Sequence, residues 1–226
     1  MSPSLLDIKT VREHLSQRIL CEVSTSEKRL ALTFDDGPHP LHTVQLLELL
    51  AGKGISATFF VVGRRVRRFR DVLQRTAEVG HEIGNHSDHH LPLSILPEFI
   101  IRREISVTES LITRVTGTKP RFLRPPMGWI NDRLLAVART MGYQPVIGNI
   151  HPQDSRQPGT QTILRRIRRR LAPGAIIILH DGGWRIGCDR SQTLAAVDTI
   201  TDELLERGYR FETLSGLVGD NSDEPG

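Results

Sequence analysis

Short apolar runs alternate with helix-like segments along almost the whole chain, and this alternation is what most restricts the fold. Runs of strand length, bounded by Gly or Pro, lie at residues 31–34, 57–62, 81–85, 122–124, 145–150, 175–179 and 209–214. Segments with helical spacing lie at 43–50, 71–79, 99–115, 132–141, 160–171 and 192–207. This order predicts a parallel sheet covered by helices.

The number of strand–helix units and the missing nucleotide motifs favour a barrel. About seven parallel strands are expected, and the chain contains neither a dinucleotide-binding G-x-G-x-x-G fingerprint nor a Walker motif. We therefore predict an α/β fold, a closed or nearly closed (β/α) barrel, over an open doubly wound sheet.

The 226 residues fit a single barrel domain with short additions at both ends. Residues 1–28 are polar and irregular, with one helix expected over 7–19, and we interpret them as an N-terminal extension. The barrel is expected over 29–217, and the polar tail 218–226 is expected to be disordered.

Charge and cysteine content exclude several classes of protein. A net charge of +4 is mild, so no nucleic-acid partner is expected. The arginine run at 165–170 is interrupted by Ile167, which with Leu164 and Leu171 follows helical spacing, so the arginines should coat the solvent face of a helix. An anionic partner such as a lipid headgroup or an acidic polymer is the alternative. Two cysteines are too few for a disulfide framework.

The first 20 residues carry several charged side chains and lack the apolar core of a signal peptide. No run reaches the apolar length of a membrane span, so no transmembrane segment is expected. The expected location is the cytoplasm, or outside the cell only if a leader has been removed. The oligomeric state is open.

The first apolar run leads directly into two adjacent carboxylates, Asp35 and Asp36, and then into Gly37-Pro38. The turn residues stop the strand, so both carboxylates lie at its C-terminal end. Neighbouring side chains on a strand point in opposite directions, so the two should have different roles: one can hold a metal while the other stays free as a base. An isolated pair of this kind would be a solvated turn.

Other chemically capable side chains also follow strands. His86, His89 and His90 follow the third, Arg124 ends the fourth, Asp154 follows the fifth, and His180-Asp181 ends the sixth. In a barrel the C-terminal ends of the strands meet at one mouth, where active sites lie. The sequence therefore predicts that these residues converge on one site.

His86 and His90 are four residues apart and close enough to hold one ion. Two imidazoles and a carboxylate form a common zinc set that leaves a position open for water, and the set also suits iron or cobalt. His89 lies between them and is the expected bystander. His39, His42, His81 and His151 lack such a context and are interpreted as surface or core histidines.

Hydrolysis at such a centre needs a base for water and an acid for the leaving group. His180 suits the acid, with a carboxylate such as Asp154 nearby to raise its pKa. Arg124 could orient Asp35. The alternatives are a structural ion pair for Arg124 and a loop-turn carboxylate for Asp154.

These residues resemble the signatures of the NodB-type polysaccharide deacetylases, carbohydrate esterase family four, and the likeness extends over residues 29–217. The matching signatures, in order, are Thr33-Phe34-Asp35-Asp36-Gly37-Pro38, His86-Ser87-x-x-His90, Arg124-Pro125-Pro126-x-Gly128, Asp154, and Leu179-His180-Asp181-Gly182. The resemblance implies a distorted (β/α) barrel that removes N-acetyl groups from N-acetylglucosamine-type polymers with a divalent metal, Zn²⁺ or otherwise Co²⁺, Mn²⁺ or Fe²⁺.

The resemblance also implies a role for each matched residue. Asp35 would be the base, and Asp36, His86 and His90 would be the metal ligands. Arg124 would orient Asp35, Asp154 would tune the acid His180, and the backbone N–H of Met127 would contact the oxyanion.

Three positions depart from the family pattern. Met127 replaces an aromatic residue, Ser155 replaces a Trp, and Ile178 replaces a Leu. The metal and proton-transfer residues are intact, so hydrolysis is expected with an altered substrate pocket. Trp129 or Trp184 could supply another ring for a sugar, or could be a core tryptophan.

The expected function is therefore deacetylation of an N-acetylated amino sugar, as an oligosaccharide, glycan or sugar precursor, which would be the partner molecule. One alternative is hydrolysis of a small non-sugar amide or cyclic imide on the same scaffold, which the missing aromatic residue favours. The other is a non-catalytic carbohydrate-binding barrel, for which loss of catalytic residues would be the signature.

Overall fold

The computed structural model describes residues 19–183, 185 and 187–219, and its centre is a seven-stranded sheet. Its strands are β1 (Arg29–Gly37), β2 (Thr58–Val61), β3 (Glu82–Asn85), β4 (Phe122–Leu123), β5 (Gln144–Pro145), β6 (Ile176–His180) and β7 (Arg210–Glu212). The order is β5-β4-β3-β2-β1-β6, and β7 also pairs with β1. Every strand pair is parallel.

The sheet curls, and the chain after β5 closes it against β6. Ile150 forms a parallel bridge with Ile177, and the Ile178 N–H donates to the Ile150 oxygen at 2.9 Å. The strand expected at 145–150 is therefore regular only over Gln144–Pro145, because the chain leaves β4 there and changes partner to β6. The distorted (β/α) barrel is confirmed.

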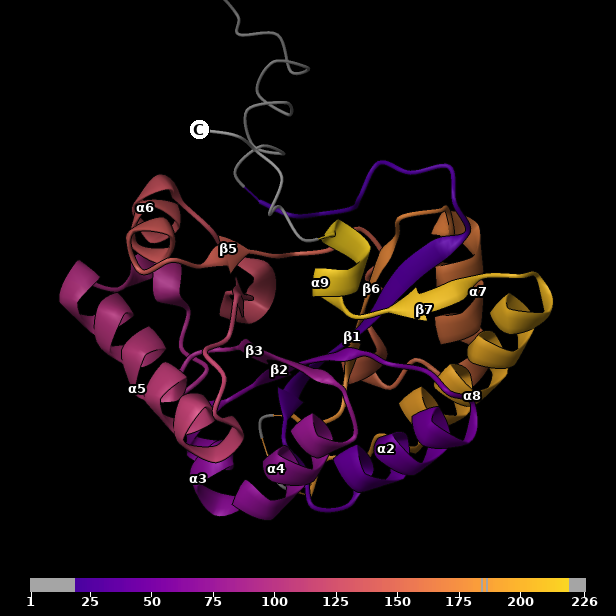
Figure 1. Ribbon diagram of the computed structural model, residues 1–226, viewed down its shortest axis with the longest axis horizontal. Helices are drawn as coiled ribbons and strands as arrows, with labels where there is room; N and C mark the ends of the chain where they lie inside the picture. Colours follow the sequence, from indigo (N-terminus) through magenta and orange to yellow (C-terminus); the bar gives the residue numbers. More distant parts are fainter. Residues whose placement is uncertain (1–18, 184, 186, 220–226) are drawn as a thin grey trace, which may run out of the picture.

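Helices surround the sheet, as Figure 1 shows. They are α2 (His42–Gly52), α3 (Gly63–Arg68), α4 (Arg70–Glu78), α5 (Glu98–Thr116), α6 (Asp132–Thr140), α7 (Thr160–Arg170), α8 (Ser191–Glu206) and α9 (Leu214–Val218). Short 3₁₀ turns lie at η1 (Leu93–Ile95), η2 (Pro126–Gly128) and η3 (Asp154–Arg156). Helices α3 and α9 were not predicted, because α3 is arginine-rich and α9 is only a short turn.

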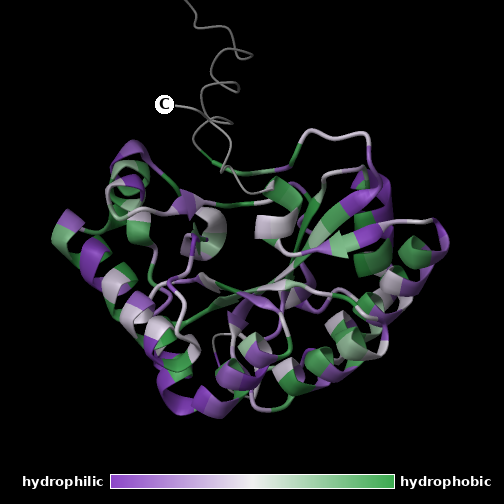
Figure 2. Cartoon of the chain, viewed as in Figure 1, coloured by the Kyte–Doolittle hydropathy of each residue, from purple (hydrophilic) through white to green (hydrophobic). Residues whose placement is uncertain are grey.

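The alternation of side chains along β1 separates the core from the barrel interior. Leu30, Leu32 and Phe34 are fully buried in the large cluster that the helices cover. Ala31 belongs to the inner cluster, which Leu214 and Leu217 of α9 share. The apolar faces of the surrounding helices turn inward and their polar faces outward (Figure 2). Asp35 shares the inward alternation of Ala31 and so lies at the top of the barrel interior.

Residues 19–23, within the predicted N-terminal extension, join the barrel edge. Leu20 bridges Val146 in parallel, and Glu22 bridges Ala175 in antiparallel orientation. Ile19 is buried. Apart from Ile19, the helix expected over 7–19 lies outside the described residues, as does the predicted tail from residue 220 onward. The tail was expected to begin at residue 218, which is wrong for Val218, because it ends α9.

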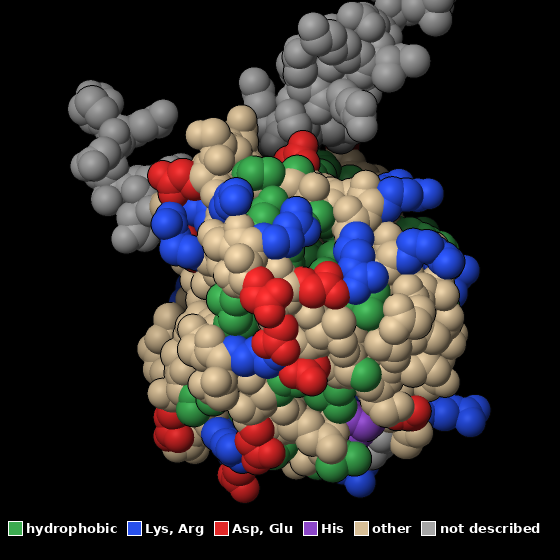
Figure 3. Space-filling model, turned by 90° about the vertical axis from the view of Figure 1, so that its right-hand side faces the viewer, with side chains coloured by type: hydrophobic (Ala, Val, Ile, Leu, Met, Phe, Trp, Pro, Cys, Tyr) green, Lys and Arg blue, Asp and Glu red, His purple; other side chains and the backbone are tan. Residues whose placement is uncertain are grey.

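The arginine run coats a helix as predicted. Ile163, Leu164 and Ile167 of α7 are buried, while Arg168 is exposed and its Nε donates to Glu203 of α8 at 2.9 Å. In Figure 3 basic and acidic side chains mix on the face shown, with no continuous basic surface. Within the described part of the chain, no helix has the length and apolarity needed to cross a bilayer.

Gly182 is needed where β6 approaches the end of β1. A Cβ added there would lie 2.1 Å from the Asp36 carbonyl oxygen, a rigid main-chain atom. We expect Gly182→Ala to lower the free energy of unfolding by ~1–3 kcal/mol through overpacking. Urea unfolding measures this, and Gly52→Ala, where nothing lies within 4 Å, is the control. Equal stability of the two variants would contradict this packing.

Candidate metal centre and active site

A cavity of about 630 Å³ opens at the C-terminal ends of the strands. Among the predicted site residues, its lining contains Asp35, Asp36, His86, His90, Arg124 and His180. Asp154 lies directly behind His180, to which it is hydrogen-bonded. The structure therefore brings all seven predicted site residues to one place.

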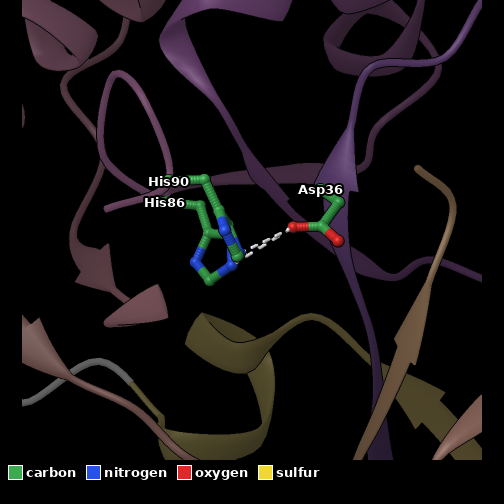
Figure 4. A group of neighbouring side chains, drawn as sticks. All are labelled: Asp36, His86 and His90. Carbon is green, nitrogen blue, oxygen red and sulfur yellow. Dashed lines mark ion pairs between the residues drawn. The ribbon is translucent and has the colours of Figure 1, made fainter. Parts of the chain in front are cut away.

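Asp36, His86 and His90 point toward one another across the cavity wall (Figure 4). His90 Nε2 lies 3.0 Å and His86 Nε2 lies 3.6 Å from Asp36 Oδ1. One ligand atom from each residue lies within 4.8 Å of the other two. Two imidazole nitrogens and a carboxylate oxygen in this arrangement fit a divalent ion with further positions open.

A bulge at the end of β1 turns Asp36 into the cavity. The pairing with β2 shifts register between Asp35 and Gly37, and Asp36 has a φ of 74°. Strict alternation would have sent the two carboxylates to opposite sides of the strand. The expectation of opposite directions is therefore wrong, because the left-handed residue breaks the alternation and both carboxylates line one cavity.

The loop after β3 presents both histidines from a tight turn. Ser87 and His90 have φ values of 64° and 59°, and the His90 N–H donates to Ser87 Oγ at 3.1 Å. His86 Nδ1 lies 2.6 Å from the Arg124 carbonyl oxygen, which leaves Nε2 facing Asp36. Burial lowers the pKa of His86 to about 4, so the ring is neutral, as a metal ligand must be.

The triad carboxylate stays ionised. Burial alone would raise the pKa of Asp36, but the hydrogen bond with His90 and the positive charge of His180 hold it well below its usual range. An ionised carboxylate beside a neutral imidazole is the protonation state that binds a cation.

Asp35 forms a buried ion pair with Arg124. Arg124 Nη1 lies 2.7 Å from Asp35 Oδ1 and donates to Thr33 Oγ1 at 2.8 Å. The guanidinium lies over the Phe60 ring, 4.1 Å from its centroid. Thr33 and Phe60 thus fix the arginine that holds Asp35. Neither was identified as a site residue from the sequence, because only the folded barrel places them beside Arg124.

His180 is held from behind by Asp154. His180 Nδ1 lies 2.8 Å from Asp154 Oδ1, and the Thr193 hydroxyl of α8 donates to Asp154 Oδ2 at 2.9 Å. Burial opposes the charged imidazole, but Asp154 and the nearby Asp36 and Asp35 raise the pKa of His180 to about 9. Burial alone would raise the pKa of Asp154, but the charge and hydrogen bond of His180 lower it. Thr193 was not predicted, and no sequence signal marks it.

Of the histidines interpreted as structural, His151 lines the cavity, with its ring centroid 6.3 Å from that of His180. Sequence reasoning missed it because the position of the loop after β5 is set by the closing of the barrel. His89 points away and bonds Glu104, with 2.8 Å between Nδ1 and Oε1. Met127 and Ser155 also line the cavity, and Met127 is 52% exposed.

The comparisons with known proteins agree with this geometry. The family model described as polysaccharide deacetylase matches residues 22–146. A peptidoglycan-N-acetylglucosamine deacetylase of Bacillus cereus is 40% identical over 199 residues, covering 87% of this chain and 91% of the relative. A chitooligosaccharide deacetylase of Rhizobium leguminosarum bv. trifolii is 33% identical, covering 90% of this chain and 98% of the relative.

Solved structures show the same architecture. A crystal structure of a peptidoglycan N-acetylglucosamine deacetylase with a bound hydroxybenzamide compound has a TM-score of 0.85 at 30% identity, covering 91% of this chain and 95% of that one. A pseudoenzyme of carbohydrate esterase family four from Bacillus anthracis has a TM-score of 0.82 at 26% identity, covering 89% and 69%. The chain therefore belongs to the polysaccharide deacetylases, the NodB-type proteins of carbohydrate esterase family four.

Proposed function

We propose that this protein is a metal-dependent hydrolase that removes the N-acetyl group from an N-acetylated amino sugar. The observation that carries the proposal is the single cavity in which the Asp36–His86–His90 triad, the Asp35–Arg124 pair and the His180–Asp154 pair meet. The relatives are deacetylases of peptidoglycan and chitooligosaccharides, which supports the sugar substrate.

The triad would hold the metal, and Zn²⁺ suits its nitrogen and oxygen donors best. A bound divalent ion would polarise the amide carbonyl and lower the pKa of the attacking water. The main chain at Met127, which lines the cavity, is our candidate for a hydrogen bond to the carbonyl oxygen as negative charge develops there.

Asp35 would accept the proton of the attacking water. Its Oδ1 bonds Arg124 at 2.7 Å, so the guanidinium keeps the carboxylate oriented while Oδ2 can face the substrate. Arg124 in turn cannot move freely, because it is buried against Phe60 and Thr33.

His180 would protonate the leaving nitrogen. Since the pKa of His180 is raised to about 9, the imidazole carries the required proton at neutral pH. Asp154 binds Nδ1, so Nε2 is left to face the cavity and the substrate amide.

The sugar would lie across a mouth that differs from the family pattern. Met127 and the nearby Trp129, which are 52% and 53% exposed, present the apolar surface on which a sugar ring could rest. Activity measured on both chitooligosaccharides and small ring amides separates the sugar substrate from the cyclic-imide alternative. Turnover of the ring amides alone would favour the cyclic-imide alternative.

The metal site can be tested by ligand replacement. We expect His90→Gln to weaken Zn²⁺ binding by more than ~100-fold, because replacing a ligand should cost more than replacing an outer-shell partner. His42→Gln is the matched control, since His42 bonds Gln45 and the Cys188 main chain and belongs to no candidate metal group among the described residues. Metal content after dialysis and competition with a chelator measure both. Full zinc binding by His90→Gln would contradict the assignment.

Asp35→Asn tests the base. It removes the proton acceptor but leaves the triad intact, so the rate of acetate release from chitooligosaccharides should fall ~10²–10⁴-fold while bound metal stays constant. An equally active variant would remove Asp35 from the proposed chemistry.

Asp154→Asn tests the acid through the pH profile. His180 must be protonated to act, so wild-type activity should decline as pH rises through about 9. Without the Asp154 charge, burial dominates and lowers the pKa of His180, so the alkaline decline should begin at lower pH. An unshifted alkaline limb in Asp154→Asn would exclude this role.

A further inference from the structure

A second hollow of about 220 Å³ borders the metal triad and contains a group of arginines. It shares Asp36, His90 and Ser155 with the main cavity. The remaining lining residues are Val62, Arg64, Arg65, Gly183 and Arg190. Asp35, Arg124 and His180 are not among them, so the hollow adjoins the triad but is not lined by the proposed base and acid.

Cationic side chains outnumber acidic ones among the described residues that line this hollow, although the buried Asp181 lies near enough to act on Arg65. Asp36 is the only acid among its described lining residues, and it is also the proposed metal ligand. Arg65 and Arg190 are each only 5% exposed. Within the described ranges, neither lies within 4.0 Å of a carboxylate oxygen. Buried guanidinium groups are normally paired with an acid, because removing an unpaired charge from water is costly.

Main-chain oxygens hold both arginines in place instead. Arg190 Nε donates to the Gly182 oxygen at 2.6 Å and Nη1 donates to the Ser155 oxygen at 3.3 Å. Arg65 Nη2 donates to the oxygens of Gly183 and Arg185, while its buried Nη1 has no acceptor among the described residues. Carbonyl groups orient these cations without neutralising them, so the site is prearranged for an anion.

Ser155 leaves the hollow open to the main cavity. Its short side chain lies on the border between the two, where family members usually have a Trp. The hollow is too small for a polymer but has room for a carboxylate or a phosphate group. Guanidinium groups bind both of these oxyanions with charge-assisted hydrogen bonds.

We propose that this arginine-lined hollow binds an oxyanion, a carboxylate or a phosphate, carried by the substrate within reach of the scissile amide. The inference rests on the proposed function for its substrate but not for its site. An anionic amino sugar derivative should therefore be a better substrate than a neutral chitooligosaccharide of the same length.

The site is tested first by binding alone. Inorganic phosphate and acetate are titrated by calorimetry into the full-length chain after metal removal, and again after zinc loading. Saturable binding to the metal-free protein is expected, and Ser155→Trp, which fills the border, should weaken it by about tenfold or more. Arg64→Gln should also weaken it. The matched control Arg68→Gln removes the same charge from α3 at an exposed position outside the hollow.

Absence of saturable binding to the metal-free protein, or equal weakening by Arg68→Gln, would overturn the site. Binding that Ser155→Trp leaves unchanged would also overturn it, because the anion would then lie elsewhere.

The substrate class is tested by kcat/KM on matched oligosaccharides that are neutral, carboxylate-bearing or phosphate-bearing. One charged substrate should be preferred over the neutral one, and Ser155→Trp should reduce this ratio toward one. Whichever charged substrate is preferred, the carboxylate-bearing or the phosphate-bearing one, identifies the oxyanion that the hollow binds. Equal turnover of all three would overturn the substrate inference while leaving the proposed deacetylase function intact. Anion binding without deacetylation of any sugar would remove the proposed function and leave the anion site.

Discussion

The bulge at the end of β1 is the local constraint on which the rest of the site depends. Because Asp36 adopts a φ of 74°, two successive carboxylates enter the same cavity from the central strand. One then meets the two imidazoles, and the other meets Arg124. Left-handed backbone at a non-glycine residue costs free energy, typically ~1–3 kcal/mol, and persists only where the surrounding structure fixes it. Gly182 packs against this turn and helps to fix it.

Most ionisable groups in the cavity are fixed by a specific partner. Arg124 holds Asp35, and Asp154 holds His180, each at a buried ion pair shorter than 3 Å. Removing one partner of such a pair generally costs ~3–5 kcal/mol, because the other charge is left buried alone. The same pairs set the proposed chemistry, since the base is oriented and the acid stays protonated. The adjoining arginine hollow differs, because Arg65 and Arg190 bond main-chain carbonyl oxygens there instead of a carboxylate.

Much of the site could be predicted from the sequence because its residues follow strands. Asp35, His86, Arg124 and His180 each lie at or just after a strand end, and parallel strands in a barrel bring those ends together. Partners that come from helices or closing loops could not be found in this way. Thr193 lies on α8, and His151 lies in the loop after β5. Their distances from the site depend on how the barrel closes.

The sequence by itself determined the order of the strands and of all the longer helices, the parallel sheet and most of the residues that converge at its mouth. Periodicity and turn residues are local properties, so they can be read without a fold. Only the tertiary structure decided that Asp36 turns into the cavity, that the segment around Leu20 joins the barrel edge, and that Arg65 and Arg190 meet beside the triad. These features arise from packing between segments distant in the chain, and no local pattern encodes the distance between such segments.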